Sequence, residues 1–195
     1  ASVTCAVCIV VGTAAAYLKV RRKSGAVKVL EKSASLAYAI PGIVMAIGVI
    51  LTWSGRFGVN LYNTIWIILV AYLARYLSFS MKSASASLQQ VHPSLEEAAR
   101  SCGASHFLSL KDVTLPLIRP AMVSGFFLIF LPAMRELTTS VLLYGPYSRT
   151  LGVAIFSLRN DGYITTASAL AALAIALILI LNTVVNAVLK DRRKV

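Results

Sequence analysis

The sequence predicts an all-α polytopic membrane protein with five transmembrane helices and one further helix in a cytoplasmic loop. Of its 195 residues, 58% are hydrophobic and only 13% are charged, and the mean hydropathy is +0.78. An ordinary soluble domain has about twice that share of charged residues. The apolar residues also gather in runs close to the roughly 20 residues that a helix needs to cross the hydrocarbon core. Composition and patterning therefore exclude an ordinary soluble domain.

Five apolar stretches are candidate spans, and together they form one transmembrane domain over residues 1–195. They cover residues 2–18, 35–53, 61–81, 121–143 and 166–189. The first is short, as expected for a chain that begins inside a longer membrane protein. Pro41 and Pro132 interrupt the second and fourth stretches, which a membrane helix tolerates where neighbours satisfy the freed backbone groups. Cys5 and Cys8 lie in the first stretch and are expected to be small buried apolar groups.

The basic residues indicate the orientation in the membrane. With five spans the two termini lie on opposite sides, and positive charge favours the cytoplasmic side. If the segment after the first span is cytoplasmic, fourteen of the nineteen basic residues lie inside and only Arg56, Arg149 and Arg159 lie outside. We therefore expect the N-terminus outside and the C-terminus in the cytoplasm. The net charge of +12 then reflects orientation and contact with lipid headgroups, so no nucleic-acid partner is expected.

Charged side chains at membrane depth are functional hypotheses, because each needs a partner or water. Arg135 and Glu136 lie in the fourth stretch, and neighbours in a helix do not face each other. One of them is expected to face a cavity or a second helix. With Pro132 and Thr139 they form our candidate translocation pathway or gate, the alternative being a structural network. Arg75 is close enough to the cytoplasmic end of the third stretch to extend its head group there.

Other polar groups in the spans suit packing or the interface. Tyr72 and Tyr76 are expected in the aromatic belt of the inner interface. Asn182 and Asn186 share one face of the last stretch, which favours hydrogen bonds between helices. In the outer loop, the apolar spacing of residues 150–158 predicts a short helix lying on the interface.

The cytoplasmic loop, residues 82–119, is the largest soluble piece. Pro93 suits a helix start, Glu96 and Glu97 fall in its favourable first turn, and Gly103 suits its end. A second short helix follows, with an apolar cluster that would need a partner to cover it in water. That cluster consists of Phe107, Leu108 and Leu110.

The spacing in this loop resembles a known family. Glu97-Ala98-Ala99, three residues, Gly103, nine residues and then Val113-Thr114-Leu115-Pro116 is similar to the EAA loop of permease subunits of binding-protein-dependent ABC importers. Val113 stands where isoleucine is commoner. Four stretches look like the C-terminal half of the ferric-iron-type permeases in that family. They are YAIPGIVMAIG (38–48), SLEEAARSCGAS (94–105), RELTTSVLLYGP (135–146) and TLGVAIFSL (150–158).

The resemblance implies a type I importer fold in which residues 94–110 contain a coupling helix. Such a helix docks into a cleft of a cytoplasmic ATPase subunit. Glu97 would make a polar contact with that subunit, and Gly103 would allow the turn. The docked surface implied by the family is supplied largely by Ala104, Ser105, His106, Phe107 and Leu108.

The same resemblance implies a permease of the bacterial inner membrane that works by alternating access. Its expected partners are ABC ATPase subunits, a substrate-binding protein and a second permease half, either fused or separate. The chain has no G-x-x-x-x-G-K-[ST] loop, so ATP and Mg are expected on the ATPase, with no enzyme activity, cofactor or resident metal here. Ferric iron is the cargo we expect. Polyamine, thiamine, phosphonate or sulfate-like anion cargo, an ion-driven secondary transporter and a membrane scaffold remain alternatives.

Overall fold

The computed structural model describes residues 1–56 and 58–191, with side chains up to residue 183. Within this part all regular secondary structure is helical, apart from one isolated bridge between Ser54 and Asn60, so the predicted all-α class is confirmed. A π-helical turn, Leu110–Thr114, joins α6 to α7. The α-helices are α1 Ser2–Arg21, α2 Gly25–Ala39, α3 Gly42–Trp53, α4 Ile65–Gln90, α5 Ser94–Ser101, α6 His106–Ser109, α7 Leu115–Met134, α8 Ser140–Leu143, α9 Leu151–Asn160 and α10 Ile164–Asp191.

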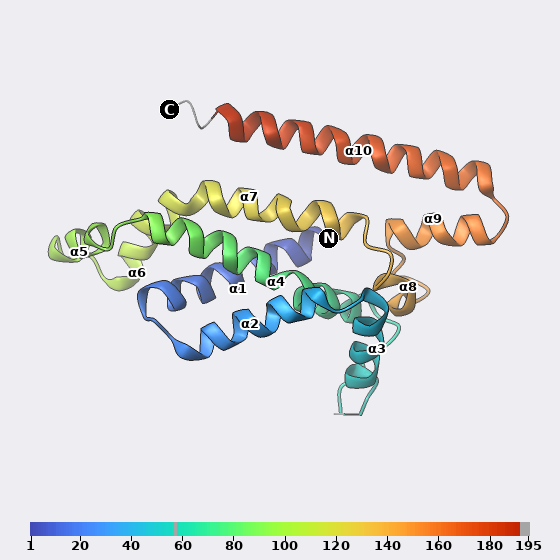
Figure 1. The fold of residues 1–195 in the computed structure, drawn as a ribbon, viewed down its shortest axis with the longest axis horizontal. Coiled ribbons are helices and arrows are strands. Elements are labelled where there is room, and N and C mark those ends of the chain that lie inside the picture. The colour runs from blue at the N-terminus through green and yellow to red at the C-terminus, as the bar shows by residue number, and fades with distance from the viewer. Residues whose placement is uncertain (57, 192–195) are drawn as a thin grey trace.

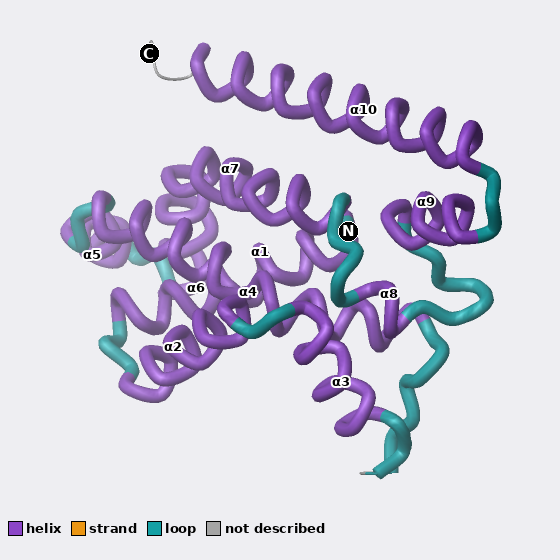
Figure 2. The backbone as a smooth tube through the Cα atoms, turned by 45° about the vertical axis from the view of Figure 1, so that its right-hand side comes forward, coloured by secondary structure: helices purple, strands orange, loops and turns teal. Residues whose placement is uncertain are grey.

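The helices form an elongated bundle with α4 at its centre. Helices α1, α2 and α7 pack against α4, and α10 runs along the far side, next to α7 and α9 (Figure 1). The short helices α5 and α6 lie at one end of the bundle, while α8 and α9 lie toward the other (Figure 2). The bundle therefore has two distinct ends, as a protein that crosses a membrane requires.

The helix boundaries differ from the predicted stretches mainly at the loop. Helix α4 starts four residues later than the third stretch and continues to Gln90, and α7 already begins at Leu115. The predicted loop 82–119 is therefore largely helical at both ends. Helix α9 corresponds to the short helix expected at residues 150–158. The side chain of Asn186 and the basic residues Arg192, Arg193 and Lys194 lie outside the described part of the chain.

The second stretch, residues 35–53, was expected to be one interrupted span, but it divides between two helices. Helix α2 already begins at Gly25, and α2 and α3 meet at an angle of 119°. The cause is Pro41, which lacks a backbone N–H and disfavours helical geometry at the preceding residue. Ile40 accordingly has extended backbone angles, φ −70° and ψ 133°.

The fourth stretch, residues 121–143, is also broken. Helix α7 ends at Met134, and the chain resumes helical geometry only in α8. Arg135 and Glu136 therefore lie in the connection between two helices, so the interruption expected beside Pro132 is a full break of the helix. Pro132 lies inside α7, two residues before the helix ends.

Two apolar clusters hold the bundle together. The larger one joins α1, α3, α4, α7 and α8 and includes Cys5 and Cys8, which are buried as predicted. The smaller one, at the end that carries α5 and α6, is formed by Ala16, Ala84, Leu88 and Ile118. In contrast, the described side chains of α10, up to residue 183, include many exposed large apolar groups, among them Leu173 and Leu179. Such a helix suits a surrounding of lipid chains or of another apolar protein surface.

Candidate functional site

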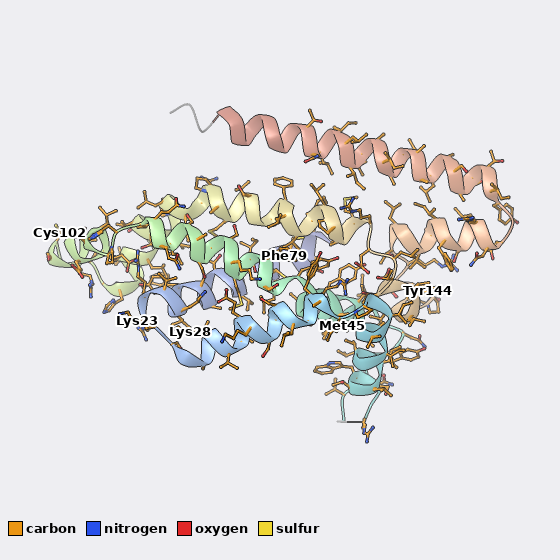
Figure 3. All side chains as sticks on the ribbon, in the orientation of Figure 1. Lys23, Lys28, Met45, Phe79, Cys102 and Tyr144 are labelled. Atoms are coloured by element: carbon orange, nitrogen blue, oxygen red, sulfur yellow. The ribbon has the colours of Figure 1, made fainter. Side chains whose placement is uncertain are left out.

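The structure organises the predicted functional residues into two sites. We call the first the loop site: helices α5 and α6 with the end of α1 against which they pack. We call the second the helix-break junction: residues 40–42 and 135–139, together with the part of α4 that contacts them. Figure 3 labels Cys102 in the loop at one end of the bundle, and Tyr144, just beyond α8, at the other.

In the loop site, α5 ends in a tight turn at Gly103. The Ala104 N–H donates to the Ala99 carbonyl at 3.1 Å, and the Gly103 N–H donates to the Arg100 carbonyl at 2.9 Å. This pair of hydrogen bonds is a Schellman motif, which requires a left-handed residue. Gly103 meets the requirement with φ +91°, so the prediction that the first loop helix ends at Gly103 is confirmed.

Beyond the turn, a capped helix presents apolar side chains to solvent. The Ser105 hydroxyl accepts a hydrogen bond from the Leu108 N–H at 3.2 Å and so caps α6. The side chain of Phe107 is 71% exposed and that of Leu108 is 49% exposed. Ala98, Ser105 and His106 are exposed as well. Large exposed apolar groups at a helix end mark a surface that a partner covers.

A groove of about 360 Å³ lies between this surface and the end of α1. It brings together residues of both signs and the aromatic rings of Tyr17 and Phe107. The groove is lined by Tyr17, Arg21, Arg22, Pro93, Glu96, Glu97, Arg100, His106, Phe107 and Leu110. Three predicted site residues therefore share one surface: Glu97, His106 and Phe107.

The carboxylate that fastens the loop to the bundle is Glu96, which the sequence analysis did not single out. Glu96 Oε1 accepts from Arg21 Nε at 2.8 Å and from Thr114 Oγ1 at 2.9 Å, and Oε2 accepts from the Tyr17 hydroxyl at 3.1 Å. The Arg21 Nη2 also donates to the Val91 carbonyl at 2.9 Å. These bonds join α5 to α1 and to the π-helical turn.

The environment of Glu96 keeps its carboxyl group charged. Burial by itself raises the pKa of Glu96, but hydrogen bonds from Arg21, Thr114 and Tyr17, with the charge of Arg21, outweigh it. The pKa therefore lies below its ordinary value. Glu97, next in the chain, is exposed and remains accessible to a partner.

Leu115 and Pro116 do not join the exposed surface. They form the first turn of α7, where proline is tolerated, and Leu115 packs against the smaller apolar cluster. The Leu-Pro part of the motif therefore has a structural position at the start of α7. Because α6, the π-helical turn and α7 follow one another without a break, His106–Met134 is a continuous helical segment of 29 residues.

At the far end of that segment lies the helix-break junction. The freed carbonyl of Ile40 accepts a hydrogen bond from Arg75 Nη1 at 3.0 Å. The carbonyl of Glu136 accepts from the Tyr72 hydroxyl at 3.2 Å and from Ser140 Oγ at 2.8 Å. A backbone break inside a membrane protein needs such donors, since no water is available there.

The side chain of Glu136 organises the connection between α7 and α8. Its Oε1 accepts from Thr138 Oγ1 at 2.6 Å, from the Thr139 N–H at 3.0 Å and from Thr139 Oγ1 at 3.1 Å. Its Oε2 accepts from the Tyr76 hydroxyl at 3.0 Å. Tyr72 and Tyr76 are thus buried partners of Glu136, and their expected place in an interfacial aromatic belt is wrong.

Arg75 connects the two breaks. Its Nε lies 3.7 Å from Glu136 Oε2, and its guanidinium lies 5.5 Å from the centre of the Tyr38 ring. The side chains of Arg75 and Glu136 are only 13% and 11% exposed. The expectation that Arg75 reaches toward the cytoplasmic end is therefore wrong, because its head group binds the Ile40 carbonyl and pairs with the Glu136 carboxylate. Its Nε is buried and makes no hydrogen bond within the described residues.

The two breaks are also in direct contact. A Cβ placed on Gly42 would overlap the Thr138 hydroxyl and lie 2.8 Å from Thr139 Oγ1. Of the predicted pathway residues, Glu136 and the fully buried Thr139 lie inside the junction, Arg135 lies in it but is exposed, and Pro132 precedes it in α7. Within the described residues there is no cluster of three or more His, Cys, Asp or Glu side chains that could hold a metal.

Comparison with known proteins gives a consistent result. Residues 8–194 match the family described as the inner membrane component of binding-protein-dependent transport systems. The putative 2-aminoethylphosphonate transport system permease protein PhnV of Salmonella paratyphi A is 37% identical over 147 residues, which cover 75% of this chain and 55% of that protein. The Fe(3+)-transport system permease protein FbpB 2 of Haemophilus influenzae is 31% identical over 139 residues, covering 71% of this chain and 27% of that protein.

The chain thus spans about half or less of the length of these two relatives. Among solved structures, inward-facing conformations of the MetNI methionine ABC transporter match with a TM-score of 0.74 and 15% identity, covering 97% of this chain and 89% of that one. This likeness confirms the predicted type I permease fold. The chain belongs to the family of inner membrane components of binding-protein-dependent transport systems, the permease subunits of ABC importers.

Proposed function

We propose that this chain is the part of an importer that converts movement of a cytoplasmic ATPase into opening and closing of a membrane pathway. The loop site docks into the ATPase subunit, with Phe107 and Leu108 as the apolar contact and Glu97 as the polar one. ATP and Mg are bound by that subunit, and this chain carries out no chemistry. A binding protein delivers the cargo from the outer side, and a second permease half completes the pathway.

The observation that carries this proposal is the continuity of residues 106–134. At 1.5 Å per residue this helical segment is about 43 Å long, enough to cross the membrane. Phe107 lies at its loop end, and the helix-break junction begins at its other end. A displacement of α6 by the ATPase is therefore transmitted along this continuous segment to the junction, where helices change direction.

The contacts that hold α5 to the bundle also support transmission of movement from the loop site to the helix-break junction. Because Glu96 bonds to Arg21 of α1 and to Thr114 of the π-helical turn, movement of the loop is passed to α1 and to the segment that leads into α7. Both of these helices pack against α4, and α4 carries Arg75 into the junction. We propose residues 132–139, with Glu136 and Thr139 at the contact, as the gate of the pathway.

The environment of Glu136 argues against an ion-driven secondary transporter. A carboxylate that carries a coupling proton or ion must release its partners during each cycle. Glu136 instead accepts four hydrogen bonds, one of them from the N–H of Thr139 just before α8, and lies beside Arg75. These contacts favour a structural role, in which the Glu136 carboxylate holds the junction together and does not carry a coupling proton.

For the cargo we propose ferric iron, with 2-aminoethylphosphonate as the second candidate. Iron is favoured by the four sequence stretches that look like ferric-type permeases and by the 31% identity to FbpB 2. Phosphonate is favoured by the 37% identity to PhnV. The ligand retained by the binding protein encoded beside this chain distinguishes them: bound Fe³⁺ supports the first, and a bound phosphonate refutes it.

The coupling role is tested with Gly103→Val and Glu97→Lys. Gly103 has φ +91° and open space around it, so valine strains the turn without a clash. Gly162→Val is the matched control, since Gly162 has φ +86° and equally open space near the opposite end of the bundle. We expect both loop variants to insert normally and to lose ATPase pull-down and transport, while the control keeps both. Undiminished ATPase pull-down by both loop variants would refute the assignment.

A further inference from the structure

We propose that a groove between α1, α2 and α4 binds an anionic phospholipid of the inner leaflet. The groove has a volume of about 640 Å³ and is separate from both sites described above. It lies on the side of the bundle opposite α10, where Figure 3 labels Lys28 on α2. It is lined by Lys19, Lys28, Glu31, Lys32, Ser35, Leu36 and Lys82.

The charge of the groove is strongly positive. Four lysines from three helices line it, against one carboxylate, Glu31. Glu31 forms an ion pair with Lys19, which joins α2 to α1 and leaves an excess of positive charge on the other lysines. Lys28, Lys32 and Lys82 are exposed, so their ammonium groups are accessible to a ligand. Convergence of lysines from separate helices favours a single anionic group between them.

Polarity changes along the groove in the way a lipid requires. Lys28, Lys32 and Leu36 follow one another at intervals of four residues and so share one face of α2. From Lys28 to Leu36 the helix rises about 12 Å. Leu36, which is 68% exposed, lies toward the helix break and therefore deeper in the membrane. A phosphate at the lysines would place an acyl chain against Leu36 and the aliphatic stems of the lysine side chains.

A soluble anion would use only the lysine end of this groove and would leave the Leu36 end exposed. An anionic phospholipid uses both, which is why we commit to it. The location at the inner leaflet rests on the proposed function, since the loop site that meets the ATPase defines the cytoplasmic side. Basic pockets between membrane helices on that side are suited to anionic headgroups.

The test measures lipid binding to the complete purified transporter, which contains this chain. Native mass spectrometry in detergent compares phosphatidylglycerol with phosphatidylcholine, before and after Lys28→Gln/Lys32→Gln. A lysine near an anionic headgroup contributes about fivefold in affinity, so the double variant should bind phosphatidylglycerol about 30-fold more weakly. The matched control is Lys111→Gln/Arg119→Gln, which removes the same charge from exposed residues at the loop end outside the groove.

The proposal predicts that the control keeps its affinity for phosphatidylglycerol, that phosphatidylcholine binds more weakly than phosphatidylglycerol, and that millimolar inorganic phosphate does not compete. Equal loss in the control would show a general charge effect and refute the groove. Competition by inorganic phosphate would identify a soluble-anion site instead. Unchanged lipid binding in the double variant would mean that the groove is empty of lipid or covered by the second permease half, and would also refute the proposal. ATPase pull-down in the same samples keeps this result separate from failure of the coupling role.

Discussion

Removal of the charges at the helix-break junction should reveal that Arg75 and Glu136 act as a pair. We consider Arg75→Gln, Glu136→Gln and the double variant. At 3.7 Å and an effective dielectric constant of about 20, two unit charges attract by about 4 kcal/mol. In each single variant the remaining charge rearranges toward other polar groups and recovers part of this attraction, so we expect a coupling energy of about 2 kcal/mol.

Each single change also leaves one charge at depth without its partner. Arg75→Gln additionally loses the hydrogen bond to the Ile40 carbonyl, so we expect it to lower the free energy of unfolding by about 3 kcal/mol. Glu136→Gln keeps part of its hydroxyl contacts and should cost about 2 kcal/mol. The double variant should therefore cost about 3 kcal/mol, less than the two single changes together.

The free energy of unfolding is measured in mixed micelles as the mole fraction of sodium dodecyl sulfate rises. As a control, Arg75→Gln is combined with Asp161→Asn. Asp161 is exposed, directly follows the C-terminal end of α9, and should act independently of Arg75. That control pair should be additive within about 0.5 kcal/mol. If Arg75→Gln and Glu136→Gln are equally additive, the junction is not held by this ion pair and the reasoning is wrong.

Two further predictions concern the contact between the breaks and the anchoring of the loop. Gly42→Ala should destabilise the protein by about 2 kcal/mol, because its Cβ would overlap the Thr138 hydroxyl. Gly48→Ala is the control, since it has open space and should be neutral or stabilising. Equal effects of the two changes on thermal unfolding would contradict the close approach at Gly42. Glu96→Gln should cost about 2 kcal/mol through loss of charge-assisted hydrogen bonds, while the exposed Glu97→Gln should change stability by less than 0.5 kcal/mol. Because the folded pKa of Glu96 is lowered, its contribution is present above the ordinary carboxyl pKa of 4.5 and is lost as the pH falls through the lower, folded value. The fall in stability between about pH 5 and pH 3 should thus be smaller in Glu96→Gln than in the parent, and an unchanged pH profile would count against the anchor.

Much of the fold follows from local sequence signals. Apolar runs located the long helices, and Pro41 and Pro132 indicated where spans are interrupted. Pro93 and Gly103 set the two ends of α5, because a proline and a left-handed glycine act through the backbone alone.

Partners that lie far apart in sequence could not be predicted in this way. Arg75 and Glu136 are separated by 61 positions in the sequence. Nothing in their immediate neighbours indicates that the break between α2 and α3 places the Ile40 carbonyl beside Arg75. Glu96 and Glu97 look alike in sequence, yet the rotation of α5 turns one toward Arg21 and the other to solvent. The choice between them depends on tertiary packing, which a single sequence does not encode locally.

The most direct test of the account is a comparison of two exposed aromatic residues at opposite ends of the bundle. Phe107 is 71% exposed in the loop site, and Tyr147 is fully exposed in the loop between α8 and α9. A photo-crosslinking amino acid is placed at each position in turn, in cells that express the complete transporter. The account predicts a crosslink to the ATPase subunit from position 107 and none from position 147. A crosslink to the ATPase from position 147, or its absence from position 107, would contradict the central claim that α5 and α6 transmit the movement of the ATPase.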